Sequence, residues 1–319
     1  MRNYSLFFLV QLLLISCQKK SADLVDTSHI EVDFSVNRFE VDFFTADQSR
    51  FKSVKQKYPM LFPQTVPDSV WLLKIRSSEE QDLYQETQKV FKDFSAYRRE
   101  LTDLFKHITF YDSTFKSPDV TTVLNRVDYA HRVIYADSLL LISLDVYLGK
   151  NHPFYSHYPS YIKENNTPQR MVVDVAKRII DTKITTSNTR TFLSKMIQEG
   201  VKLYLLDLYL PLKEDALKIG YPKEKLEWAL SNEEQIWRYF IENSLLYDTS
   251  VQLNQRFLDT APFSKFYINE DRKSPGRIGQ WIGWQIVRSF MDNNEASPRD
   301  LLSLNESEIF KKSRYKPRR

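Results

Sequence analysis

Residues 171–180 read MVVDVAKRII, and residues 192–210 read FLSKMIQEGVKLYLLDLYL. Apolar residues interrupted by polar ones at helical spacing predict two amphipathic helices, over about 169–183 and 190–209. Four more segments of helical character follow in the chain, at 222–230, 232–246, 277–292 and 298–312. Together these segments predict that the second half of the chain is helical.

Local signals support several of these helices. Ser231 and Glu234 have the spacing of a capping box, and Ser297, which precedes a proline, has the features of an N-cap. Gly279 and Gly283 are four residues apart in an apolar segment. In a membrane this spacing would favour a helix dimer. The arginines and glutamines nearby favour instead a buried helix that a neighbour approaches closely.

The residues before position 150 predict a small sheet and one long helix. Strand-like runs lie at 32–36, 120–124, 132–136 and 139–148. An apolar stripe predicts a helix over 86–108. Only six glycines occur in 319 residues, which argues against a many-stranded β protein and against glycine-rich phosphate loops. The expected fold class is α+β, mainly helical, with a small sheet in the N-terminal half packed on helices.

The N-terminus has the pattern of a bacterial lipoprotein signal. Residues 1–17 read MRNYSLFFLVQLLLISC, with a positive charge at Arg2, an apolar run, and the only cysteine of the chain at Cys17. The cysteine sulfur would carry the lipid, and cleavage before Cys17 would remove the signal. The alternative is an ordinary secretory signal with an incidental cysteine. The apolar run is too short to span a bilayer permanently.

These features divide the chain into four predicted parts. Residues 1–16 are the signal peptide, 17–28 a lipid-anchored tether, 29–312 a single α+β domain, and 313–319 a basic C-terminal tail. The tail is expected to be solvated, with contact to anionic lipid headgroups or an acidic partner as the alternative. A net charge of +4 is too small to imply nucleic-acid binding. We expect a protein of the cell envelope.

The two helices quoted first have the layout of a gluzincin-type zinc peptidase, which carries H-E-x-x-H on one helix and a glutamate on a later one. Val173, Asp174 and Lys177 would occupy the first motif, and Glu199 with Gly200 the second. Valine has no donor atom, and a protonated lysine cannot bind a metal. Two interpretations therefore stay open: a coincidental pair of amphipathic helices, and a degenerate zincin-like site without metal or cofactor. A working metallopeptidase is the third and least favoured alternative.

Other chemistry has weaker support. His152 and His157 could meet in a loop, although polar loop residues are the preferred interpretation. Asp137 and Asp145 flank an apolar strand and could form a carboxylate pair for acid–base catalysis. Aspartates at strand ends more often cap turns.

Seven segments of the chain resemble the gliding-motility lipoprotein B (GldB) family of Bacteroidetes-type bacteria. They are LISC at 14–17, YPMLFP at 58–63, RVIYADSLLLISLDVYLG at 132–149, MIQEGVKLYLLDLYLP at 196–211, NEEQIWRYFIEN at 232–243, APFSKFY at 261–267 and SPGRIGQWIGWQIVRSFM at 274–291. The resemblance implies an outer-membrane lipoprotein that faces the periplasm and is needed for gliding. It also implies a link to type IX secretion and a distant relation to zinc peptidases. Only Cys17 carries over as a functional residue.

The function expected from these features is non-catalytic. We expect a membrane-anchored structural or assembly component that binds other gliding and secretion proteins of the envelope, with no nucleic-acid partner. One alternative is a cryptic zincin-like hydrolase that uses Asp174, Glu199 and either His152 or His157. Another is a module that binds a glycan or peptide in the relic cleft.

Overall fold

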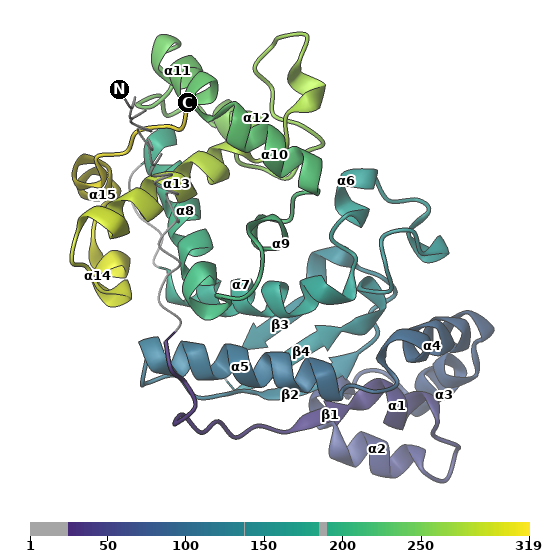
Figure 1. Ribbon diagram of the computed structural model, residues 1–319. Coiled ribbons are helices and arrows are strands. Elements are labelled where there is room, and N and C mark those ends of the chain that lie inside the picture. Colours follow the sequence, from purple (N-terminus) through teal and green to yellow (C-terminus); the bar gives the residue numbers. More distant parts are fainter. Residues whose placement is uncertain (1–24, 137, 185–189) are drawn as a thin grey trace, which may run out of the picture.

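The computed structural model describes residues 25–136, 138–184 and 190–319 (Figure 1). Four short strands form one mixed sheet in the order β1-β2-β4-β3. They are β1 (Val36–Arg38), β2 (Asp119–Val123), β3 (Val133–Ala136) and β4 (Leu139–Ser143). β1 and β4 run parallel to β2, and β3 runs antiparallel to β4. The predicted class, α+β and mainly helical with a small sheet, is confirmed.

The predicted strands differ from the observed ones at two ends. β1 begins at Val36 instead of position 32, and β4 ends at Ser143, where a single 3-10 turn, Leu144–Val146, follows. The turn is stabilised by Asp145, whose buried carboxylate accepts the backbone N–H groups of Asn125 and Val127. The apolar run to position 148 therefore continues into the core without remaining a strand.

Five helices surround the sheet in the N-terminal half: α1 (Phe39–Phe44), α2 (Phe51–Lys57), α3 (Asp68–Arg76), α4 (Ser78–Phe91) and α5 (Ser95–Tyr111). The single helix expected over 86–108 is wrong, because the chain breaks between α4 and α5. There Asp93 accepts the backbone N–H of Ser95 at 2.8 Å and so starts a new helix. The rings of Phe91, Phe94 and Tyr97 pack together at the break.

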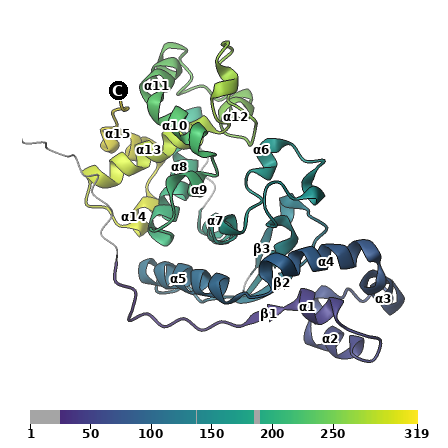
Figure 2. The same cartoon turned by 45° about the vertical axis from the view of Figure 1, so that its right-hand side comes forward.

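Ten helices follow the sheet. They are α6 (Ser160–Lys163), α7 (Met171–Lys183), α8 (Phe192–Tyr209), α9 (Asp215–Ile219), α10 (Lys223–Ser231), α11 (Glu233–Glu242), α12 (Gln252–Phe257), α13 (Ile278–Asn293), α14 (Pro298–Ser303) and α15 (Glu306–Ser313). α5 runs along the sheet, and α7 lies between the sheet and the stacked C-terminal helices (Figures 1 and 2).

The capping signals had mixed outcomes. Ser297 forms a full capping box with Asp300, as its position before proline predicts. The capping box of Ser231 and Glu234 is wrong, because Ser231 ends α10 and α11 starts without a side-chain cap. The helix expected over 298–312 is two helices, since the Asn305 side chain accepts the N–H of Glu308 and starts α15.

The centre of the helical body is a crossing of α8 and α13 at backbone contact. A Cβ atom on Gly283 would lie 1.7 Å from the carbonyl oxygen of Met196, and one on Gly200 would lie 2.3 Å from the Gly283 carbonyl carbon. Trp281 and Trp284 beside the crossing are buried. The prediction of a buried glycine-containing helix is therefore confirmed.

Replacing Gly283 with alanine tests this crossing. The added methyl group has no space against backbone atoms, so we expect Gly283→Ala to lower the free energy of unfolding by about 3 kcal/mol or more. Urea unfolding followed by circular dichroism measures the change. Asp292→Ala, at an exposed position of the same helix, should stay within about 0.5 kcal/mol of wild type. Equal stability of the two variants would contradict the packing argument.

Candidate functional site

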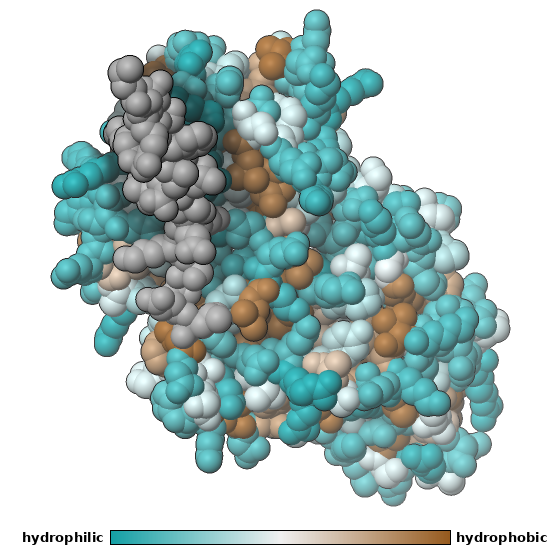
Figure 3. Space-filling view, in the orientation of Figure 1, coloured by the Kyte–Doolittle hydropathy of each residue, from teal (hydrophilic) through white to brown (hydrophobic). Residues whose placement is uncertain are grey.

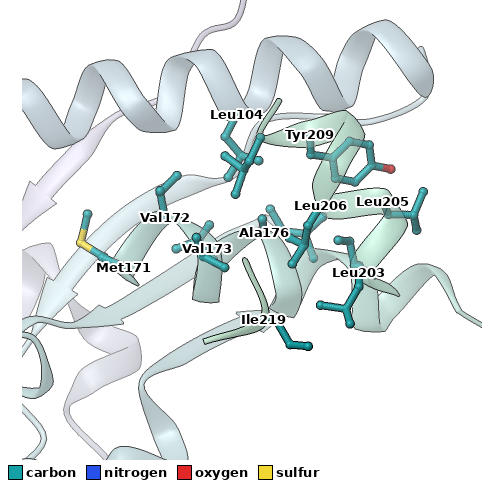
Figure 4. Close-up of a cluster of buried hydrophobic side chains, with 14 of the residues drawn as sticks. Leu104, Met171, Val172, Val173, Ala176, Leu203, Leu205, Leu206, Tyr209 and Ile219 are labelled. Carbon is teal, nitrogen blue, oxygen red and sulfur yellow. The ribbon is translucent and has the colours of Figure 1, made fainter. Parts of the chain in front are cut away.

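The predicted site residues on α7 lie in two environments. Val173 is completely buried and lies among the apolar side chains of the core (Figure 4). Asp174 and Lys177 are partly exposed. The first ligand position of the zincin-like pattern therefore belongs to the hydrophobic core.

Asp174 is held by three side chains. Arg170 donates from Nε to Oδ1 at 2.7 Å, and the Tyr147 hydroxyl donates to Oδ2 at 3.1 Å. Arg132 Nη1 lies 3.8 Å from Oδ2. Burial raises the pKa of Tyr147 well above its ordinary value, so this residue stays a neutral donor. Both carboxylate oxygens of Asp174 thus have partners within the protein.

The two arginines connect this carboxylate to other segments. Arg170 is buried, and its Nη1 donates to the backbone carbonyls of Leu217 and Lys218 in α9. Arg132 Nη1 donates to the carbonyl of Asn165 at 2.9 Å. The polar cluster therefore joins the start of β3, the loop after α6, α7 and α9. This is a role in positioning segments of the fold.

Lys177 lies one turn beyond Asp174 in an environment that disfavours its charge. Its pKa is lowered to about 7, mainly by burial and also by the positive charges of Arg170 and Arg277, against the attraction of Asp174 and Glu199. At neutral pH the amine is therefore about half protonated. No side chain in the described part of the chain hydrogen-bonds it.

Arg277 is the other cation that faces this region. It precedes α13 in the left-handed region, with φ of +61°, and its guanidinium lies 5.4 Å from the centre of the Tyr221 ring. Nη2 donates to the carbonyl of Gly220 at 3.2 Å. Arg277 and Tyr221 also line a pocket of about 200 Å³ between α6, the start of α10 and the residues before α13.

Glu199 makes its own local pair. Its carboxylate lies 2.9 Å from Lys202 Nζ on the next turn of α8, and Lys202 also lies 3.2 Å from Asp181. Glu199 reaches the α7 residues only through longer-range electrostatics. Within residues 25–136, 138–184 and 190–319, no group of three or more His, Cys, Asp or Glu side chains is arranged to hold a metal ion.

The family model for gliding motility protein GldB matches residues 20–317, which is nearly the whole chain. The chain belongs to this family. The GldB family makes it a gliding-motility lipoprotein associated with the cell envelope. No curated protein and no solved structure matches the chain. The zincin-like layout has no structural match and stays a prediction.

The predicted lipid-attachment residue of this GldB-family protein is Cys17. Cys17 lies outside the described residues. Among the helices that the structure describes, none is both long and apolar enough to cross a bilayer.

The other candidates among the described residues are His152, His157 and Asp145. His152 Nε2 is 3.4 Å from Glu86 and its ring packs on Phe154, whereas His157 is exposed. Asp137 lies outside the described residues. Asp145 stabilises a turn, which confirms the turn interpretation for this residue.

Sequence reasoning missed several residues of the cluster. The spacing of Arg170 and Asp174 by four positions could have indicated their ion pair on one face of a helix. Arg132, Tyr147 and Arg277 come from distant segments, and no local pattern connects them to α7. Only the tertiary fold brings these groups together.

Removal of the buried guanidinium tests the structural role of the cluster. Arg170→Met leaves the Asp174 charge partly desolvated and two carbonyls without their donor, so we expect a loss of about 3 kcal/mol in the free energy of unfolding. Arg178 is exposed on the same helix, and Arg178→Met should change stability by less than about 0.5 kcal/mol. Equal losses of stability in the two variants would contradict a structural role for the cluster.

The buried carboxyl group of Asp145 should make the stability of the fold depend on pH. Burial raises its pKa from 3.8 to about 6, against the N–H groups of Val127 and Asn125, which lower it. The folded chain binds the proton more tightly, so this carboxyl stabilises the fold most below about pH 4. That contribution is lost as the pH rises through about 6.

Asp145→Asn cannot titrate and serves as the reference. The free energy of unfolding of wild type minus that of the variant should fall by roughly 2 kcal/mol between about pH 4 and pH 7. Urea unfolding at a series of pH values measures this difference, and the other titrating groups largely cancel. A difference that stays constant with pH would show that the burial of this carboxyl has no such effect.

Proposed function

We propose that this protein is a non-catalytic structural or assembly component of the gliding machinery, anchored by lipid on Cys17 and linked to type IX secretion. We further propose that it is attached to the outer membrane and faces the periplasm. The family membership supports the gliding role. The main support for a non-catalytic role is the composition of the polar cluster on α7.

A zincin-like hydrolase would need about three metal ligands and a free base at this place. Val173 is in the core, and Lys177 cannot bind a metal while it is protonated. Both oxygens of Asp174 already accept hydrogen bonds, from Arg170 and from Tyr147. The same groups that would have to act on a substrate instead hold the fold together. These contacts support a structural role for the region.

Exposed apolar side chains support a role in assembly. The visible face of the molecule is mainly hydrophilic, with apolar side chains gathered in separate patches (Figure 3). Around α11 and α12, five large apolar side chains are more than half exposed: Ile241, Tyr247, Val251, Tyr267 and Ile268. Burial of these side chains against a partner protein would be favourable.

A ligand-binding module is the second candidate, and the pocket beside Arg277 favours it. Arg277, which donates to the carbonyl of Gly220, lines about 200 Å³ of open space, and its charge interacts with that of Lys177. A small group that carries a carboxylate or phosphate would fit the positive charge. A hydrolase and such a module need different residues, so one experiment separates them.

Colony spreading of a strain that lacks the gene tests the three functions. The Asp174→Asn/Glu199→Gln double variant should restore spreading if the role is structural and should fail if the chain is a hydrolase. If the double variant restores spreading and only the Lys177→Gln and Arg277→Gln variants fail to restore it, the ligand-binding module is favoured. Immunoblotting must show equal protein levels, because Asp174 contributes to stability. Normal spreading without the gene would overturn the motility role.

A separate arm tests the anchor. Cys17→Ala removes the sulfur that would carry the lipid, so the variant should lose palmitate labelling and fail to restore spreading. The unchanged chain, expressed at the same level, is the control. Full labelling of the variant would show that Cys17 is not the attachment site.

A further inference from the structure

The C-terminal tail is bound to the helical body. The backbone carbonyl of Ser313 accepts from Ser289 Oγ at 2.8 Å and from Asn293 Nδ2 at 3.1 Å, both on α13. Arg314 then takes a left-handed conformation, with φ of +51°, which ends α15 and turns the chain toward α11. The tail that was predicted to be solvated is therefore held on the body through its backbone at Ser313.

Tyr315 and Glu233 bind the tail to α11. The Tyr315 hydroxyl donates to Glu233 Oε1 at 2.9 Å, and its ring meets Trp237 edge-on at 5.3 Å between ring centres. The backbone N–H of Arg318 donates to the same oxygen at 3.3 Å. Glu233 is only 2% exposed, so these two donors replace the water that a carboxylate would otherwise bind.

This docking holds a row of cations on the surface. All six basic residues of segment 311–319, here named the C-terminal basic strip, are exposed: Lys311, Lys312, Arg314, Lys316, Arg318 and Arg319. Within the described chain only Lys312 is in an ion pair, with Glu308 at 2.6 Å. Against these six cations stand Glu306 and Glu308, so the side chains of residues 306–319 carry a net charge of +4.

We propose that the C-terminal basic strip binds the anionic headgroups of membrane lipids and so fixes the orientation of the body on its membrane. Charge complementarity supports this partner, because a basic segment beside an anionic bilayer gains about fivefold in binding for each cation. The docked backbone presents the cations together, and little further ordering is needed on contact. The inference rests on the lipid anchor of the proposed function.

The position at which the described chain begins favours lipid headgroups, and not an acidic protein, as the partner of the strip. The start of the described chain, drawn in dark purple, lies on the left-hand side of both views, as do α14 and α15 (Figures 1 and 2). Eight residue steps separate Cys17 from Val25, and eight residues extend at most about 28 Å. An anchor at Cys17 therefore keeps the bilayer close to the side that carries the strip.

Energy transfer from a dye on the protein to acceptors in the bilayer tests the inference. The lipidated chain has no other cysteine than Cys17, so Ser307→Cys on α15 gives one labelling site beside the strip. The protein is reconstituted into neutral vesicles and into vesicles with about 30% anionic phosphatidylglycerol. Transfer should rise in the anionic vesicles and fall back in about 0.5 M salt, which screens exposed charges.

Two controls make the result specific. Gln48→Cys places the same dye before α2, at the far end of the molecule, where lipid charge should not raise transfer. A strip variant with glutamine at Lys311, Lys316, Arg318 and Arg319 should lose the rise at Ser307→Cys. It keeps the ion-paired Lys312 and the residue that ends α15.

A variant with the same loss of charge elsewhere completes the design. It carries glutamine at four exposed basic residues of the N-terminal half: Lys52, Arg76, Lys92 and Arg99. This variant should retain the rise. The inference would be overturned if energy transfer were the same in neutral and anionic vesicles. It would also be overturned if the strip variant and the matched charge variant gave the same rise. Vesicle flotation reports the anchor separately, so failure of Cys17 lipidation is distinguishable from failure of the strip.

Discussion

The contact of α8 with α13 through bare backbone is the constraint on which the rest of the structure depends. Gly200 and Gly283 face each other, and the carbonyl of Met196 fills the place of a side chain on Gly283. This close approach buries both tryptophans of α13 and brings Arg288 within 2.7 Å of Asp207 on α8 and of Asp215 on α9. A larger residue at either glycine would move the helices apart and expose these groups.

The polar cluster on α7 depends on the same arrangement. Arg277 comes before the first residue of α13, so the position of that helix decides where its guanidinium lies relative to Lys177. Arg170 connects α7 to the carbonyls of α9, which packs against α8. The charges around Asp174 therefore result from helix packing, and their main effect is to hold neighbouring segments in register.

Much of the fold was predictable because its signals are local. The β-branched run of β2 and the apolar stretches of α7 and α8 each specify their own element, and all three were predicted. The helices α2 and α3 were missed because prolines at positions 59, 63 and 67 suggest an irregular segment. The packing of Phe62 on Trp71, at 5.0 Å between ring centres, stabilises them through tertiary contact. The candidate site was harder for the same reason, since only the Arg170–Asp174 pair is local.

The long separation of the two central helices has a consequence for biogenesis. Gly200 and Gly283 are 83 positions apart, so the crossing of α8 with α13 cannot form until almost the whole chain has been made, whereas α8 can pack on α5 and α7 before that. Contacts of such long sequence separation form slowly, because a large loop must close before they are made. The tail contacts on α11 and α13 can form only after the last residues are available. The central crossing and the docking of the tail are therefore the last parts of the fold to be completed as the chain is made.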